Sequence, residues 1–450
     1  MKFSKSLLIR TLLGSLAIIG GGSTLSVLVT SCELDGGKVL TDVFNVKDDH
    51  IITGFKDNIS FRHLTAGYVL NFHELGIDQI GDDSLESNEM TGFTLSPYTS
   101  INFDLKTNSD QIVKFYSMLS SFSLENVNIV SDLTVSEGYS SGSYLFYGVN
   151  FSNLSVLSLE NSDWAYSASE NAPSEVKKTL PHNTLNFSGY NSFANCQFPN
   201  LLTLNLNGAN FSHSYMGYAQ TDVSSGYGFF AGSDFGKLQN ISLENTKFAD
   251  GYMNAKAAIP SRASTADHMF ADCIFESLSD IDFSNCVLAQ GHMVSAYGGR
   301  YCYTASHMFD GASFLAMTSL SFAGGCFAVD NLGPWGRMNW CSTASHTFDS
   351  AVFPNLTNID FSDVVFNGVA DNTAFAEGTF ASAEFDVLEE INFRDLTQTT
   401  MAGGTATFST VTFPVEGILY TNLASPYTTA PVAGAFGTSI PSGWTWTTNS

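Results

Sequence analysis

One frame of apolar residues recurs along the chain from residue 146 onward. It reads F-x4-F-x2-L-x2-[LI]-x-[LF]-x4-[FLW], and its copies begin at Phe146, Phe193, Phe230, Phe270, Phe309, Phe348 and Phe380. The frame positions are apolar throughout except at Gln398. Degraded copies precede and follow the series, at Leu119, Phe122, Leu124 and Ile129, and at Phe408, Phe413 and Leu419. A fixed apolar frame with spacers of variable length predicts stacked repeats whose connecting loops tolerate insertions.

Each copy contains a short strand followed by a tight corner. The pairs Leu204-x-Leu206 and Ile281-x-Phe283 have the two-residue period of a strand. Two residues after this pair stands a residue type that tolerates left-handed backbone or forms its own turn: Asn161, Gly208, Asn245, Asn285, Gly324, Asp363 and Asp395. The large side chains of one copy are covered only when neighbouring copies stack on it. We therefore expect an all-β or mainly β repeat protein.

Two segments of the frame carry a resemblance to a known family. The stretch Leu278-x2-Ile281-x-Phe283-x2-Cys286-x-Leu288 matches the leucine-rich-repeat pattern LxxLxLxxCxL. Segments such as Phe193-Ala-Asn-Cys196 resemble the F-x-x-C/A segments of bacterial BspA-like surface repeats. The resemblance covers about residues 146–413 and implies a leucine-rich-repeat-like parallel solenoid of about seven to nine long coils. It also implies a role in surface adhesion or protein interaction, although these copies are longer than the usual leucine-rich repeat.

The remaining segments predict further divisions of the chain. Residues 32–37 read as a short acidic tether, and residues 38–110, with alternating apolar runs, as a β-rich N-terminal cap. Residues 111–420 hold the solenoid repeats. Residues 421–450 are rich in Pro, Thr, Ser and Gly, and we expect either a C-terminal cap with a final edge strand or a loose tail.

The N-terminal residues resemble a bacterial lipoprotein signal peptide. A basic start is followed by an uncharged apolar stretch, Leu12–Leu28, and by the lipobox-like sequence Val29-Thr30-Ser31-Cys32. We expect residues 1–31 to be removed and Cys32 to carry lipid, including palmitate, so that the protein is anchored at the cell membrane or outer surface, on the extracytoplasmic face. An ordinary signal peptide or a membrane helix is the alternative, but the glycines at 20–22 disfavour a durable span.

The charge of the chain limits its partners. The formal net charge is −25 at pH 7, and residues 1–31 hold three basic and no acidic residues. Without them, 15 basic against 43 acidic residues give −28. A surface this acidic repels phosphate backbones, so nucleic-acid binding is disfavoured, and it is not attracted to anionic lipid headgroups. The lipid on Cys32 is therefore the expected membrane attachment.

No motif makes a strong case for catalysis. Gly138-Tyr-Ser140-Ser-Gly142 matches GxSxG, but the opening of a repeat follows it instead of the helix that a nucleophile elbow needs. Carboxylates are scattered and arginines are scarce. We therefore expect no catalytic residue and no cofactor, and a protein or glycan binding module instead of an enzyme. The alternatives are a polysaccharide-active enzyme on a parallel β-helix and a structural envelope spacer.

Three histidines occupy one repeat position. His268, His307 and His346 each stand two residues before the first Phe of a copy, and each closely follows a Thr-Ala pair that serine or tyrosine precedes. In stacked copies their side chains would lie about one strand spacing, ~4.8 Å, apart. Such a column could bind zinc or another borderline metal. Because repeats copy residues for packing, we favour a structural corner with no metal and keep the metal site as the alternative.

Cysteines and aromatic residues suggest two more candidate features. Cys302 and Cys341 each stand seven residues before the first Phe of adjacent copies, which allows a disulfide or two free buried thiols. The spacers carry aromatic residues and a histidine that either bind a partner or cover the flank of the repeats: Tyr215, Tyr252, His292, Tyr297, Trp335 and Trp340.

Overall fold

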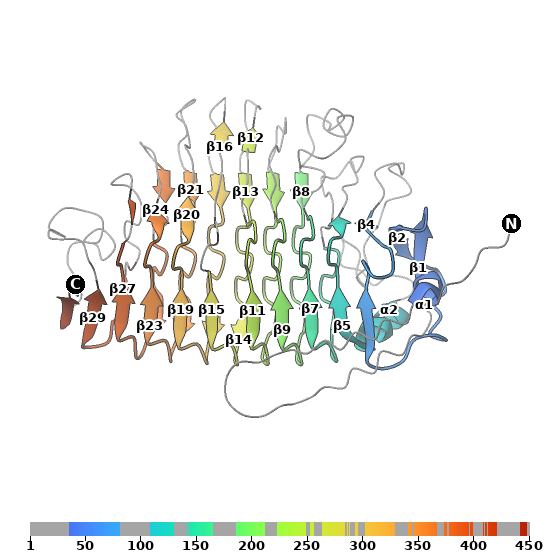
Figure 1. Ribbon diagram of the computed structural model, residues 1–450, viewed down its shortest axis with the longest axis horizontal. Coiled ribbons are helices and arrows are strands. Elements are labelled where there is room, and N and C mark those ends of the chain that lie inside the picture. Colours follow the sequence, from blue (N-terminus) through green and yellow to red (C-terminus); the bar gives the residue numbers. More distant parts are fainter. Residues whose placement is uncertain are drawn as a thin grey trace, which may run out of the picture. The chain divides into compact units, whose positions relative to one another are not determined.

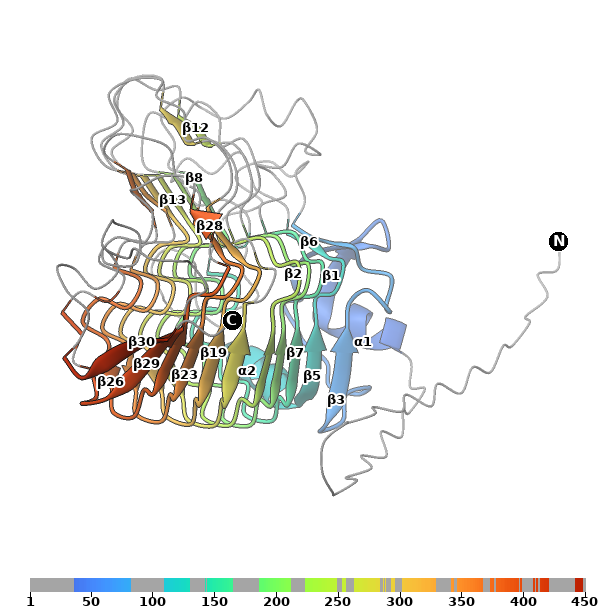
Figure 2. The ribbon, with the colours of Figure 1, turned by 60° about the vertical axis from the view of Figure 1, so that its left-hand side comes forward.

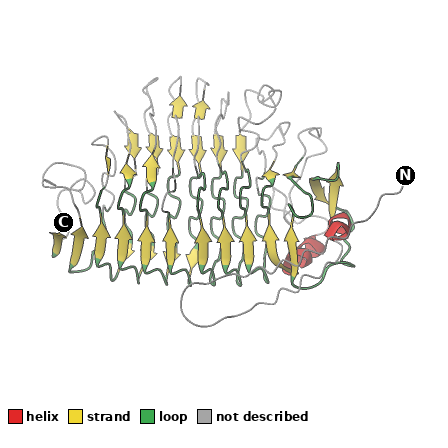
Figure 3. Cartoon of the chain, viewed as in Figure 1, coloured by secondary structure: helices red, strands yellow, loops and turns green. Residues whose placement is uncertain are grey.

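The computed structural model divides the chain into two compact units, Met1–Leu34 and Asp35–Ser450, and every helix and strand named below belongs to the second. The residues that it describes are 36–81, 109–129, 142, 144–164, 186–211, 223–248, 253–255, 263–283, 286, 288, 293–295, 302–328, 341–343, 346–366, 373–375, 378–395, 397–398, 408, 410–411, 413–420 and 442–447. These residues are mainly β, with helices at α1 (Gly36–Val43) and α2 (Ser109–Ser117) (Figure 3). Within these ranges, no helix has the length and apolar character needed to cross a membrane.

The strands of the frame form parallel sheets in which each copy pairs with the next. One sheet has the order β11-β9-β7-β5-β3, with strands β3 (Tyr68–Asn71), β5 (Leu119–Ser123), β7 (Val156–Ser158), β9 (Thr203–Asn205) and β11 (Asn240–Ser242) (Figure 1). A second has the order β15-β19-β23-β27-β29-β30, with strands β15 (Asp280–Asp282), β19 (Ser319–Ser321), β23 (Asn358–Asp360), β27 (Glu390–Asn392), β29 (Gly417–Tyr420) and β30 (Trp444–Thr447) (Figure 2). The strands of the seven frame copies are each centred on the first residue of the apolar pair, such as Leu204 in β9 and Ile281 in β15, so the predicted short strands are confirmed.

Other segments of the copies pair in the same parallel manner. A six-stranded sheet contains β8 (Asn186–Ser188), β10 (Val223–Ser225), β13 (Ala263–Thr265), β17 (Cys302–Thr304), β21 (Cys341–Thr343) and β25 (Thr373–Phe375). A four-stranded sheet contains β14 (Ile274–Phe275), β18 (Ser313–Phe314), β22 (Val352–Phe353) and β26 (Glu384–Phe385). A three-stranded sheet contains β20 (Cys326–Ala328), β24 (Val365–Phe366) and β28 (Thr397–Gln398). A two-stranded sheet contains β12 (Met253–Ala255) and β16 (Met293–Ser295).

Strand pairing extends to both ends of the repeat array. At the N-terminal end, β1 (Phe44–Lys47) is antiparallel to β2 (Ile51–Phe55), but β2 is parallel to β4 (Gln79–Ile80), which in turn pairs with β6 (Asn128–Ile129). Strand β3 is likewise parallel to β5. Parallel pairing therefore begins inside residues 38–110, the segment predicted as a β-rich N-terminal cap, and helix α1 precedes its strands. At the C-terminal end, residues 444–447 form strand β30 beside β29.

The core consists of columns of stacked phenylalanine rings. Phe270 stacks on Phe309 with ring centroids 4.9 Å apart, and Phe309 stacks on Phe348 at 4.8 Å, with 3° between the planes in each case. The frame side chains that the structure describes are buried, apart from the partly buried Ile241. The stacking follows from the register: Ile281 pairs with Leu320 and Leu320 with Ile359, so identical frame positions lie one strand spacing apart.

Left-handed backbone marks the corners of the copies. The predicted corner after the frame strand is confirmed by positive φ angles at Asn161 (53°), Gly208 (64°), Asn245 (58°), Gly324 (67°), Asp363 (55°) and Asp395 (56°); Asn285 lies outside the described residues. A second left-handed corner stands two residues before the first Phe, at Tyr144, Asn191, Gly228, His268, His307, His346 and Gly378. Asn, Asp and His are enriched among non-glycine residues with positive φ, so the residue types at these corners follow from the backbone.

Replacing Gly208 tests the corner. Gly208→Val is expected to lower the free energy of unfolding by about 1–3 kcal/mol, because the position has φ 64° and an added Cβ would collide with Oδ1 of Asn161. Gly208→Asn should lose less, since asparagine occupies the equivalent corners of other copies. Denaturant melts measure both variants, with Gly236→Ala as the control, because Gly236 does not have left-handed backbone and its nearest neighbour would be 3.4 Å from a Cβ. Equal losses in all three variants would contradict the corner assignment.

Candidate functional site

A column of aromatic rings runs along the corner that precedes the first Phe of each copy. Ring centroids lie 5.1–5.6 Å apart from Tyr144 through Tyr190 to Tyr227, and 5.3 Å apart between Tyr227 and His268. His268 lies 4.9 Å from His307, and His307 lies 5.2 Å from His346. The expected spacing of the three histidines is confirmed. We call these three residues the histidine column.

The backbone explains why histidine can occupy this position. The φ angles of His268, His307 and His346 are 55°, 51° and 52°, in the left-handed region where histidine is enriched. The backbone N–H of His268 donates to the carbonyl oxygen of Ser306 in the next copy at 3.1 Å. This bond holds successive corners at the strand spacing. The recurrence of histidine is therefore consistent with copying of a structural corner.

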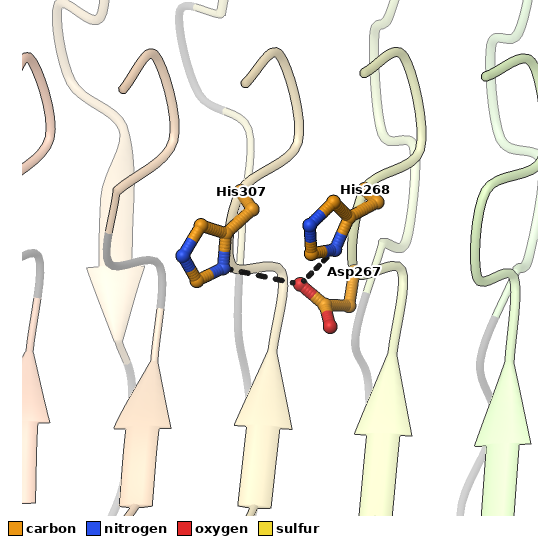
Figure 4. A group of neighbouring side chains, drawn as sticks. All are labelled: Asp267, His268 and His307. Carbon is orange, nitrogen blue, oxygen red and sulfur yellow. Dashed lines mark ion pairs between the residues drawn. The ribbon is translucent and has the colours of Figure 1, made fainter. Parts of the chain in front are cut away.

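Asp267 adds a carboxylate to the histidine column. Its side-chain Oδ1 lies 3.0 Å from Nδ1 of His268 and 3.4 Å from Nδ1 of His307 (Figure 4). Asp267 is only 3% exposed, so its charge is held almost entirely within the protein. In most other copies tyrosine or serine stands at this position, such as Tyr227 and Ser306, and in the last copy it is Glu377. That departure from the repeat was the signal that could have found it.

The charges of the cluster shift the ionisation of its members. Burial acts to raise the pKa of Asp267, but its polar contacts with His268 and His307 and their positive charge outweigh burial and lower the pKa. Burial acts to lower the pKa of His268, but its contact with Asp267 and the negative charges of Asp267, Asp310 and Asp272 raise it. Burial also raises the pKa of Asp310, which lies 4.0 Å from Nε2 of His268. The carboxylates around His268 therefore favour a positive charge on its imidazole.

His346 belongs to a separate pair. Its Nδ1 lies 3.0 Å from Oδ2 of Asp349, in its own copy. In the following copy Gly378 occupies the corner, and a Cβ there would approach Cε1 of His346 to 2.7 Å. The small residue makes room for the ring and ends the column. The structure thus joins His268 and His307 through Asp267 and leaves His346 outside that group.

The structure describes the backbone of the predicted cysteine pair but not its side chains. Cys302 and Cys341 are register partners in the adjacent parallel strands β17 and β21, while their side chains lie outside the described part of the structure. Cys196, Cys273 and Cys286 are free and buried. Cys196 and Cys273 each donate from Sγ to the carbonyl oxygen of the first Phe of the preceding copy, at 3.1 Å. Burial raises the pKa of Cys286 to about 12, so these thiols act as packing groups and not as nucleophiles.

The other candidates from the sequence fall outside the described residues. This holds for the lipidation residue Cys32 and for Ser140 of the GxSxG segment. It also holds for the aromatic residues and histidine of the spacers, namely Tyr215, Tyr252, His292, Tyr297, Trp335 and Trp340. Their roles stay predictions.

A row of polar side chains lies on the outer face of the second long sheet. The central residue of each strand, such as Ile359, is buried, while the third residue points the opposite way. We call the in-register third residues of four neighbouring strands the polar ladder: Asp282, Ser321, Asp360 and Asn392. Within it, Nδ2 of Asn392 donates to Oδ1 of Asp360 at 2.9 Å. The polar ladder repeats hydrogen-bonding groups at the strand spacing.

The cluster of Asp267, His268 and His307 and the polar ladder can support different chemistry. The buried carboxylate and the two imidazoles can form an ion pair or share a cation, and the polar ladder can hydrogen-bond to an extended partner. No protein-family model matches the chain, and neither a curated protein nor a solved structure matches it. The residues and their arrangement are therefore the basis for assigning a function.

Proposed function

We propose that the protein is a lipid-anchored bacterial surface protein that binds a protein or glycan partner and has no enzymatic activity. Its repeats would form a leucine-rich-repeat-like parallel solenoid of about seven to nine long coils. The polar ladder is the observation that supports this proposal best. It offers donors and acceptors in a row, which suits a partner that is itself extended.

The composition of the polar ladder favours hydrogen bonding over apolar contact. Asp282 is exposed, and Ser321, Asp360 and Asn392 are half-buried. The side-chain oxygens of these three accept hydrogen bonds from backbone N–H groups two residues later, so a partner would bond their remaining lone pairs and hydrogens. Carboxylate, hydroxyl and amide groups bond hydroxyl groups of sugars and backbone groups of peptides. Many weak contacts at a regular spacing add up along an extended partner. The negative charge of Asp282 and Asp360 also disfavours polyanionic partners.

The N-terminal sequence supports a surface location for this binding. The residues Val29 to Cys32 resemble a lipobox, and a diacylglyceryl group on Cys32 would hold the protein at the membrane. The second compact unit begins at residue 35, three residues after this cysteine in the sequence.

Binding assays with the fragment 33–450 test the proposal. We expect it to capture a partner from surface-protein extracts or from a glycan array, and Asp282→Lys to weaken capture about tenfold or more by placing a cation on the polar ladder. Glu276→Lys is the matched control, because Glu276 is exposed directly after strand β14 of a different sheet. Its capture should equal that of the parent fragment.

Two outcomes would contradict the proposal. Capture of no protein and no glycan would favour a structural envelope spacer. Equal weakening by Asp282→Lys and Glu276→Lys would show that overall charge governs capture and that the polar ladder has no special part in it.

A further inference from the structure

We propose that Asp267, His268 and His307 form a binding site for one divalent metal ion of the zinc class. The site lies at a corner of the repeats, away from the polar ladder, and it does not depend on the proposed binding of a partner. Its ligands would be Oδ1 of Asp267 and the Nδ1 atoms of the two histidines.

The distances from the carboxylate oxygen to the two imidazole nitrogens suit such an ion. They all lie within 4.8 Å of one another, and Oδ1 is 3.0 Å and 3.4 Å from the two Nδ1 atoms. Ligands at about 2.0–2.1 Å from a tetrahedral zinc ion lie about 3.4 Å from each other. Imidazole nitrogen and carboxylate oxygen are ligands that zinc and similar borderline ions accept.

The burial of Asp267 is the second observation that points to a cation. A carboxylate that is 3% exposed is costly unless a positive charge compensates it. Oδ1 of Asp267 and Nδ1 of His268 face each other, yet their contact lacks the geometry of a regular hydrogen bond. A metal ion between these atoms would satisfy both and would replace protons on the imidazoles as the source of positive charge.

Copying of the repeat accounts for the histidines but not for the carboxylate. In the next copy Ser306 stands at the position of Asp267, and His307 and His346 stack there at 5.2 Å. The stack of rings therefore forms without the carboxylate. Glu377 shows that the position can hold another carboxylate, but Asp267 is the one that lies beside two imidazoles and is almost fully buried, and a bound cation would compensate its charge.

The rings must turn to bind the ion. The imidazoles of His268 and His307 are stacked with only 13° between their planes. The Nδ1 lone pair of each ring lies in the plane of that ring, so the two lone pairs lie in nearly parallel planes and do not converge on one point. Rotation about the Cβ–Cγ bonds would direct both lone pairs to one point near Oδ1. The side chains are 31% and 23% exposed, which gives the rings room on their outer side and leaves a coordination position open to water.

Titration of the metal-stripped full chain with Co²⁺ tests the site, because visible absorption reports the coordination of cobalt directly. We expect one equivalent of Co²⁺ to bind and to give an absorption spectrum typical of cobalt with nitrogen and oxygen ligands. Zn²⁺ should displace it. Asp267→Asn and His307→Gln should each weaken binding at least tenfold. His346→Gln is the matched control and should bind as the parent does, because His346 pairs with Asp349.

Circular dichroism establishes whether each variant is folded. If Asp267→Asn is not folded, Asp267→Ser replaces it, because serine stands at the equivalent position 306 of the next copy. Absence of stoichiometric cobalt and zinc binding in the parent would overturn the proposal. Equal binding by the parent and a folded Asp267 variant would overturn it as well, and so would a loss in His346→Gln as large as in His307→Gln.

Discussion

Phe322→Ala is expected to lower the free energy of unfolding by about 3–5 kcal/mol. The ring of Phe322 is 1% exposed and stacks between Phe283, at 5.2 Å, and Phe361, at 5.1 Å. Its removal therefore leaves a cavity that both neighbouring copies line, and the parallel backbones on either side limit how far the site can collapse. Denaturant melts monitored by circular dichroism measure the loss.

Leu315→Ala is the matched control for this prediction. Leu315 is also a large apolar residue of the same copy, but it is 42% exposed. Its truncation should change the free energy of unfolding by about 1 kcal/mol or less. If the two variants lost similar stability, the frame would not form the core that its burial indicates.

Cys32→Ala is expected to abolish lipid attachment. The thiol of Cys32 is the group that would receive the diacylglyceryl chain, and cleavage before residue 32 would depend on that modification. The variant should accumulate as an uncleaved precursor, incorporate no labelled palmitate and shift out of the detergent phase. Metabolic labelling followed by detergent partitioning measures all three effects.

Cys196→Ser controls for the loss of a cysteine elsewhere. Serine already fills this position in another copy, where Oγ of Ser233 donates to the carbonyl oxygen of Phe193 at 2.8 Å, as Sγ of Cys196 donates to that of Phe146. This variant should keep the label and the partitioning of the parent. Incorporation of palmitate by Cys32→Ala at the level of the parent would refute the lipobox interpretation.

The recurrence of the frame made much of the core predictable. Phe309 stacks between the first Phe of the copies before and after it, Phe270 and Phe348, so its burial follows from its place in the frame. The corner residues were predictable for a related reason, because only a few residue types tolerate left-handed backbone, and Asn161 and Asp363 are among them. Where the frame decays, as in residues 38–110, the sequence no longer indicated that parallel pairing continues.

The pairing of Asp267 with two histidines could not be predicted in this way. The repeat placed His268 and His307 in one column, but Asp267 breaks the repeat, so no periodicity marks it. Its importance lies in distances across two copies and in a burial that is unusual for a carboxylate. Likewise, the separation of His346 depends on Asp349, whose contact is a matter of side-chain orientation.

By itself, the sequence determined the repeat, the residues of the core and the chemistry of the corners, because these depend on apolar periodicity and on the backbone preferences of single residues. Only the tertiary structure decided which sheets the strands form, where parallel pairing begins, and which charged groups meet. Those properties depend on the register between segments about forty residues apart, which brings side chains together without leaving a local trace in the sequence.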